Sequence, residues 1–149
     1  MKRFVTVAML ATLAFASIGQ SNDFVDQLLG SKAVTYGQVA YLILVSSGNI
    51  GEDVDTERAF EFLRALDWTP PNAAFDRPIR LDQYALLLSR AFGLGGNLEQ
   101  SIFPTAHGAY HSLSSIQVIQ GKSDPGMPVS GIQAIQMIGR VSDLVGMSQ

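Results

Sequence analysis

A repeat about fifty residues long is the feature that most constrains how this chain folds. The stretch that begins at Pro78 is written again from Pro128, and both its apolar and its polar positions recur. The matched pairs are Ile79 with Val129, Gln83 with Gln133, Leu87 with Met137, Leu88 with Ile138 and Arg90 with Arg140. A looser copy lies upstream, where Val34 and Gln38 match Ile79 and Gln83. A repeat of this period indicates helical units that bury their apolar faces only against one another.

Each copy has the apolar spacing of an amphipathic helix, and each is preceded by a shorter helical pattern. The longer predicted helices cover residues 35–47, 79–92 and 129–145. We therefore predict an all-α fold with three helix-loop-helix repeats over residues 20–48, 54–93 and 103–146. One helix pair cannot bury its own apolar face, so we expect the repeats to pack with pseudo-threefold symmetry around a central three-helix bundle.

The first residues have the pattern of a secretory signal peptide. Lys2 and Arg3 precede an apolar run from Phe4 to Ala16, with small residues near its end. A membrane anchor is the less favoured alternative, because the run is well short of the roughly 20 residues that a membrane-spanning helix needs. We expect residues 1–19 to be a signal peptide cleaved near residues 16–19. Residues 20–149 are then one exported domain, in the periplasm or on the surface of a bacterium.

Composition narrows the classes of partner. The chain has no cysteine, so neither a disulfide framework nor a lipid-bearing thiol is expected. Without Lys2 and Arg3 it has 8 basic residues against 13 acidic ones, a net charge of about −5. An acidic domain without a basic run is a poor candidate for binding nucleic acid. We expect no membrane span once the signal peptide is removed.

The repeat unit resembles the surface-layer homology (SLH) repeat. In the third unit the resemblance rests on Ala109-Tyr110-x-x-Leu113, Val118-Ile119-Gln120-Gly121, Asp124-Pro125-Gly126 and Pro128-Val129-Ser130. More weakly, residues 123–131 are similar to secreted SLH-like proteins of spirochaetes. The resemblance implies a three-lobed helical prism that holds envelope proteins on acidic cell-wall polysaccharide.

The SLH motif credited with ligand contact is Thr-Arg-Ala-Glu, at the start of each central helix. The corresponding segments here are Thr35-Tyr36-Gly37-Gln38, Arg80-Leu81-Asp82-Gln83 and Ser130-Gly131-Ile132-Gln133. Two copies keep a capping box in Ser/Thr-to-Gln form. All three lack the motif arginine, whose forked guanidinium grips an acidic sugar. The resemblance therefore predicts the fold more firmly than it predicts the ligand.

We find no catalytic constellation and no cofactor motif in the sequence. His107 and His111 lie four residues apart on a predicted helix and could face one metal ion. No third ligand follows at a suitable spacing, so two solvent-facing histidines are the simpler interpretation. The candidates for binding an anion are Arg80, Arg90, Arg140 and Lys122. A helix dipole also favours a cation in the last turn, which gives Arg90 and Arg140 a structural explanation.

These observations predict an exported, non-enzymatic SLH-like module that binds or scaffolds within the cell envelope. Its expected partner is an envelope protein or an acidic cell-wall glycan, and no cofactor is expected. One alternative is a divergent polysaccharide-binding anchor that uses the arginines named above. The other is a small metal-dependent hydrolase that uses His107 and His111.

Overall fold

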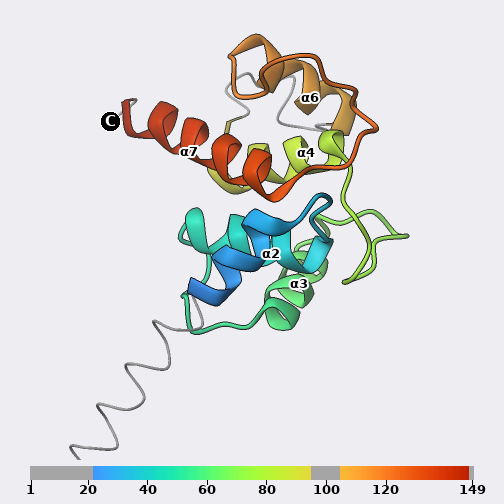
Figure 1. The fold of residues 1–149 in the computed structure, drawn as a ribbon, viewed down its shortest axis with the longest axis vertical. Helices are drawn as coiled ribbons and strands as arrows, with labels where there is room; N and C mark the ends of the chain where they lie inside the picture. The colour runs from blue at the N-terminus through green and yellow to red at the C-terminus, as the bar shows by residue number, and fades with distance from the viewer. Residues whose placement is uncertain (1–21, 95–104, 148–149) are drawn as a thin grey trace, which may run out of the picture.

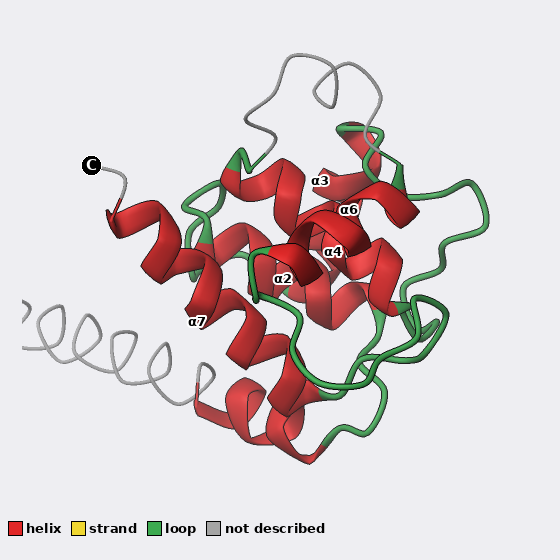
Figure 2. Ribbon diagram, turned by 90° about the horizontal axis from the view of Figure 1, so that it is seen from above, coloured by secondary structure: helices red, strands yellow, loops and turns green. Residues whose placement is uncertain are grey.

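The computed structural model describes residues 22–94 and 105–147, whose regular elements are six helices (Figure 1). They are a helix over 22–30, α2 (Tyr36–Ser46), α3 (Thr56–Ala65), α4 (Leu81–Phe92), α6 (Ala106–Ser115) and α7 (Gly131–Met147). The predicted all-α class is confirmed, since these residues form no strand (Figure 2). Within the described ranges, no helix has the length and apolar character needed to cross a membrane. The predicted signal peptide and the start of the third repeat at residue 103 lie outside the described residues.

Helices that pair in space come from neighbouring predicted repeats. The helices α2, α4 and α7 contact one another, while α3 packs against α2 and α6 packs against α4 (Figure 1). In the sequence, however, α3 shares its repeat with α4. The short connection over residues 47–55 turns α3 back onto α2 as an antiparallel neighbour. Each of these pairs therefore joins one repeat to the next.

The extended segments that precede α2, α4 and α7 meet through their backbones. Val34 lies between the other two segments, because its N–H donates to the carbonyl of Val129 at 2.8 Å and its own carbonyl accepts from the N–H of Ile79 at 3.0 Å. Two isolated antiparallel bridges continue this contact, one between Thr35 and Pro78 and one between Arg80 and Pro128. These residues precede helices, so the bridges do not extend into a sheet.

The first residue of each of these three helices donates to a loop from another repeat. The bonds run from Tyr36 N–H to the Arg77 carbonyl, from Leu81 to Met127 and from Gly131 to Ser31, at 2.9 to 3.0 Å. Together they form a closed cycle from the first repeat to the second, to the third and back. The backbone donors at a helix start have no partner inside their own helix. Here they hold the repeats together.

The core lies among the helix faces that the apolar spacing predicts. Fully buried side chains include Val39 and Ile43 of α2, Leu87 and Leu88 of α4, and Met137 and Val141 of α7. Burial of each large side chain contributes about 1.5 to 3 kcal/mol. Tyr84 is also fully buried, and its hydroxyl donates to the carbonyl of Ala134 at 2.7 Å, which ties α4 to α7.

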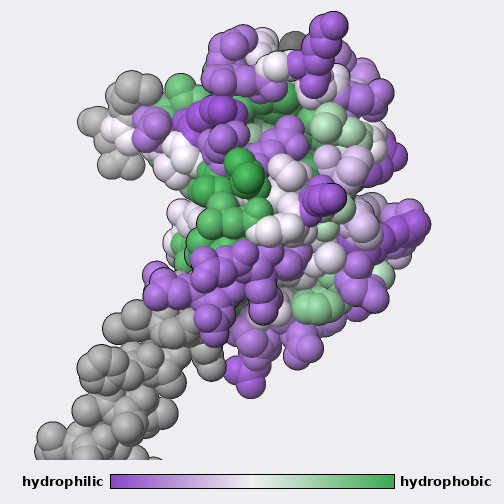
Figure 3. Space-filling view, in the orientation of Figure 1, coloured by the Kyte–Doolittle hydropathy of each residue, from purple (hydrophilic) through white to green (hydrophobic). Residues whose placement is uncertain are grey.

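Some apolar side chains remain at the surface. Figure 3 shows apolar residues in the notch below α7. Val25 and Leu29 of the helix over 22–30 and Ile132 of α7 are exposed, and the approach of Gly131 to Leu28 brings these two helices together. We call these three exposed side chains the apolar patch.

Replacement of Tyr84 by Phe should lower the free energy of unfolding by about 1 kcal/mol, because a buried hydrogen bond is lost. Burial raises the pKa of Tyr84 well above its usual value. The folded protein therefore holds the phenolic proton more tightly than the unfolded chain, and stability should fall as the pH rises above about 10. Denaturant titrations at several alkaline pH values measure both effects. An unchanged pH dependence in Tyr84→Phe would contradict the assignment.

Gly131→Ala should destabilise the fold, because a Cβ at this position would overlap the backbone carbonyl of Leu28. Backbone cannot move aside as a flexible side chain can, so we expect a loss of about 1 to 3 kcal/mol. Gly139→Ala is the matched control in the same helix, where a Cβ meets no atom within 4 Å. There alanine should add about 0.5 to 1 kcal/mol through helix propensity. Denaturation midpoints compare the two variants, and equal stability would disprove the close approach.

Candidate functional site

The loop that joins α3 to α4 packs against the start of α2. Two consecutive N–H groups of α2 hold it, since Tyr36 donates to the Arg77 carbonyl at 3.0 Å and Gly37 donates to the Phe75 carbonyl at 2.9 Å. Gly37 has no side chain to interfere, and a Cβ there would collide with the Phe75 ring. The Phe75 ring also meets Phe60 of α3, with centroids 6.0 Å apart. The loop is therefore anchored at both its backbone and its side chains.

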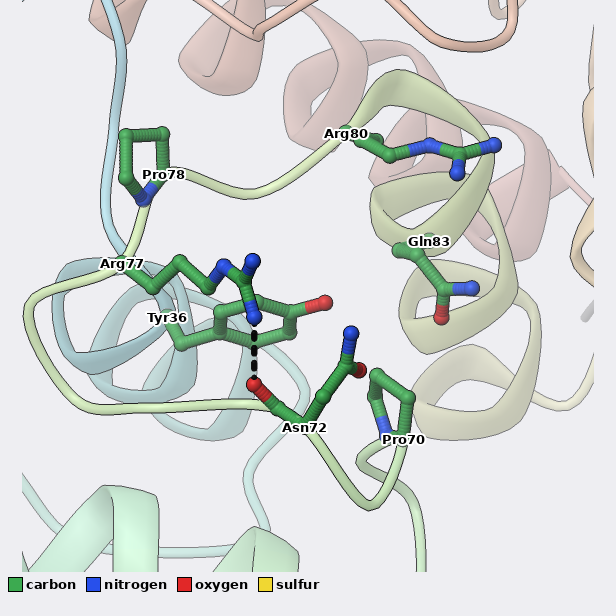
Figure 4. Close-up of a pocket in the computed structure, with 7 residues that line it drawn as sticks. All are labelled: Tyr36, Pro70, Asn72, Arg77, Pro78, Arg80 and Gln83. Carbon is green, nitrogen blue, oxygen red and sulfur yellow. Dashed lines mark hydrogen bonds between the residues drawn. The ribbon is translucent and has the colours of Figure 1, made fainter.

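A cavity of about 250 Å³ lies between this loop and the starts of α2 and α4 (Figure 4). Its lining residues are Tyr36, Pro70, Asn72, Arg77, Pro78, Arg80 and Gln83. Figure 4 shows Arg77 and Tyr36 on one side and Arg80 with Gln83 on the other. We call this space the arginine cavity. It combines two guanidinium groups, two carboxamides and one aromatic ring, and it lies where α2 and α4 begin.

Arg80 is held by a buried carboxylate. Its Nη2 lies 2.6 Å from Oδ2 of Asp82, whose side chain is 7% exposed while that of Arg80 is 60% exposed. The other oxygen, Oδ1, accepts from the N–H of Gln83 at 2.8 Å. Arg80 precedes the first residue of α4 and makes no capping bond, so Asp82 satisfies a free donor of that helix start. Asp82 thus fixes the guanidinium and supports the helix.

Arg77 is held from within its own loop. Its Nη1 donates to the carbonyl of Asn72 at 2.8 Å, and its backbone N–H donates to the carbonyl of Ala74 at 3.1 Å. A guanidinium has five N–H donors, so one bond to a carbonyl leaves donors that can reach a ligand. Among the described residues that line the cavity, none carries a carboxylate, and Asp82 lies beside only one of the two arginines.

Tyr36 adds a neutral wall to the cavity. Burial raises the pKa of its hydroxyl, and the negative charge of Asp82 raises it further, while Arg77 and Arg80 oppose the shift. The hydroxyl therefore keeps its proton at neutral pH. Together these groups can donate hydrogen bonds to carboxylate, phosphate or hydroxyl oxygens. None of the lining side chains is suited to act as a nucleophile or a general base at neutral pH.

The structure separates the four cations that the sequence suggested as an anion site. Arg80 lines the arginine cavity. Arg140 instead donates from Nη1 to the carbonyl of Val118 at 3.0 Å, which gives it a structural role after α6. Arg90 lies in the last turn of α4, and Lys122 is exposed in the loop before α7. None of these three is among the lining residues of the cavity.

The sequence analysis missed Arg77, Asn72 and Tyr36 as partners of Arg80. The segment over residues 70–78 has turn-forming residues but no periodic pattern. Its placement depends on carbonyls that accept from α2, and every residue type has such a carbonyl. One residue in the sequence could have indicated this contact. Gly37, the third residue of Thr35-Tyr36-Gly37-Gln38, has no side chain and so leaves room for another chain segment.

A second cavity, of about 310 Å³, lies near the helix over 22–30 and combines aromatic and acidic side chains. Phe24 and Tyr41 meet edge to face there, with centroids 4.7 Å apart, and the Tyr41 hydroxyl donates to the Glu52 carbonyl at 3.1 Å. Burial raises the pKa of Tyr41, and the carboxylates of Glu52 and Asp53 add to the shift. Asp55 also lines this cavity and caps α3 by accepting from the N–H of Arg58 at 2.8 Å.

His107 and His111 are both exposed on α6, as the simpler interpretation of the sequence predicts. Their Nε2 atoms lie 2.9 Å apart. Among the residues that the structure describes, no group of three or more His, Cys, Asp or Glu side chains is placed to hold a metal ion.

Comparison with models of protein families, with curated proteins and with solved structures finds no match to this chain.

The pairing of Arg80 with Asp82 predicts a measurable coupling between them. In a double-mutant cycle with Arg80→Ala and Asp82→Ala, we expect a coupling energy of about 1 kcal/mol, at the upper end for surface ion pairs because one partner is buried. The matched control is Arg64 with Glu61 on α3, a pair at 3.3 Å whose side chains are 58% and 68% exposed. That pair should couple by only about 0.3 to 0.5 kcal/mol. Equal coupling in the two cycles would show that Asp82 does not hold Arg80.

Proposed function

We propose that this chain is an exported, non-enzymatic binding module of a bacterial cell envelope, built from three SLH-like repeats. In this proposal α2, α4 and α7 form the central bundle of a pseudo-threefold arrangement. Three observations support it: the sequence repeat, the mutual contacts of these helices, and the cycle of backbone bonds at their starts. The signal-peptide pattern supports export.

The arginine cavity is the single observation that carries the binding role. Arg80 and Gln83 occupy the first and fourth positions of the segment that the SLH resemblance associates with ligand contact. The motif arginine belongs at the second position, where this chain has the buried Leu81. In our proposal Arg80 and Arg77 supply guanidinium groups from neighbouring positions. The ligand contact of the motif is thereby kept with different residues.

An acidic cell-wall glycan is the ligand that this chemistry favours. Guanidinium groups recognise carboxylate and phosphate through paired N–H donors, while Asn72 and Gln83 can bond to sugar hydroxyls. A cavity of about 250 Å³ is small for a ligand site, so it suits one charged group or ring of a longer polymer. Without Lys2 and Arg3 the exported chain carries a net charge of about −5, so attraction to a polyanion must come from these local contacts.

An envelope protein is the second class of partner, and the apolar patch supports it. Exposed apolar groups on two adjoining helices offer the kind of surface that a partner protein covers. The patch has no charged member, so binding there should depend little on salt, whereas glycan binding at the arginine cavity should weaken as salt increases. This difference separates the two proposals.

Purified cell-wall sacculi that retain their acidic polymers test the glycan proposal by cosedimentation. We expect the wild-type protein to bind and Arg77→Ala/Arg80→Ala to bind at least about tenfold more weakly, because each lost charged contact contributes about 1.5 to 3 kcal/mol. Arg58→Ala/Arg64→Ala removes the same charge from exposed positions of α3 and is the matched control. It should bind within about twofold of the wild type, because exposed charges away from the site contribute little.

Two results would count against glycan binding at the cavity. One is equal weakening in the two double variants, which would indicate a nonspecific charge effect. The other is no binding of the wild-type protein at low salt. In either case the apolar patch becomes the site to test, with Leu29→Ser and Ile132→Ser and with envelope protein extracts as the ligand.

A further inference from the structure

We infer that His107 and His111 form a two-nitrogen binding site for a divalent copper ion on the exposed face of α6. The two Nε2 atoms already lie 2.9 Å apart, and their rings meet edge to face with centroids 4.4 Å apart. Both side chains are exposed, so an ion can approach them from solvent. This site is separate from the arginine cavity and does not depend on the proposed envelope function.

The 2.9 Å between the nitrogens is the length of a hydrogen bond, and it shows that the two rings can bring their Nε2 atoms together. An ion held by both nitrogens at about 2.0 to 2.1 Å with an angle of about 90° between them needs a similar separation. That angle joins neighbouring positions of a square-planar or tetragonal ion, the geometry of Cu²⁺ and Ni²⁺. A tetrahedral Zn²⁺ ion needs the nitrogens about 3.3 Å apart. Of the two tetragonal ions, Cu²⁺ has the higher intrinsic affinity for imidazole.

The helix beneath the two histidines is held in place, so little order has to be created when an ion binds. Thr105 caps α6 by accepting from the N–H of Gly108 at 3.0 Å. Ala109 and Leu113 are buried on the opposite face, where α6 packs against α4. Positions four apart on a helix lie one above the other, which places both rings on one side. The chelating pair is therefore carried by a fixed backbone.

Tyr110 restricts the second ring further. Its ring lies edge to face with that of His111, with centroids 5.4 Å apart, and its hydroxyl is anchored on Ser123 at 2.9 Å. A fixed ring loses less freedom on binding than a mobile one, which favours affinity.

When both imidazoles are neutral, binding of the ion releases no proton. In the ion-free protein, one neutral imidazole donates from Nε2 to the Nε2 lone pair of the other. Binding requires a lone pair on both Nε2 atoms, so the donor ring moves its proton to Nδ1 and stays neutral. Water or an external ligand fills the remaining positions of the ion. The site is thus open, and it is complete with two side chains of this chain.

Titration of the full chain, prepared without a histidine tag, with Cu²⁺ tests the inference by calorimetry and electron paramagnetic resonance. We expect one ion per chain with a two-nitrogen signal, and tighter binding of Cu²⁺ than of Zn²⁺. His107→Gln and His111→Gln should each weaken binding by about 100-fold, because the loss of either ligand removes the gain from holding two together. Circular dichroism should show unchanged helix content, since both side chains are exposed.

The matched control is Gln120→His, which adds an imidazole at an exposed position away from α6 in sequence. Introduced into His107→Gln, it should not restore wild-type affinity, because position 120 does not lie four residues from His111 on α6. The inference is overturned if either single variant binds as tightly as the wild type, if the signal shows one nitrogen, or if the wild type binds no Cu²⁺. Each of these results leaves the sacculus experiment unaffected.

Discussion

The cycle of backbone hydrogen bonds at the starts of α2, α4 and α7 is the constraint on which the rest of the structure depends. A helix start leaves backbone donors unpaired, and leaving them buried without partners costs free energy. Here the first residue of each helix donates to a loop that belongs to another repeat. Loss of one such bond would therefore both expose a helix start and loosen the contact between two repeats. The close approach of Gly131 to Leu28 shows how little space the arrangement leaves.

The same cycle determines where the arginine cavity lies. It draws the loop over residues 70–78 onto α2 and so brings Arg77 near Arg80, although neither arginine takes part through its side chain. The N–H groups of Tyr36, Gly37, Leu81 and Asp82 all donate to protein carbonyls. These helix-start donors are therefore not available to an anion in the cavity, whose affinity must come from the guanidinium and carboxamide groups. This is why the proposal rests on arginine chemistry and not on the helix dipole.

The sequence predicted the structure best where helical periodicity or a hydrogen bond between residues close in the chain determines it. The apolar spacing predicted the helices. The predicted capping box of Thr35 and Gln38 forms both of its hydrogen bonds. Of the other predicted box, one bond is present, in which the Ser130 hydroxyl accepts from the Gln133 N–H. Periodicity says which face of a helix is buried but not which neighbour covers it, so the packing of α3 on α2 was not predicted. Arg77 was not predicted to line a site, because its loop is held through backbone carbonyls, which every residue type has.

The second repeat departs from the other two at the position where the cavity lies. Thr35 and Ser130 each provide a hydroxyl that accepts from a backbone N–H of the helix that follows. The side chain of Arg80 has no hydrogen-bond acceptor, and Asp82 accepts from the Gln83 N–H instead. A hydroxyl would be the locally better choice for the helix start. What the arginine adds is a guanidinium that a buried carboxylate holds at the edge of the cavity. Departures from local preference are expected where a site needs a particular group. In the proposed function, the second repeat lacks a hydroxyl cap because its place is taken by a guanidinium at the cavity.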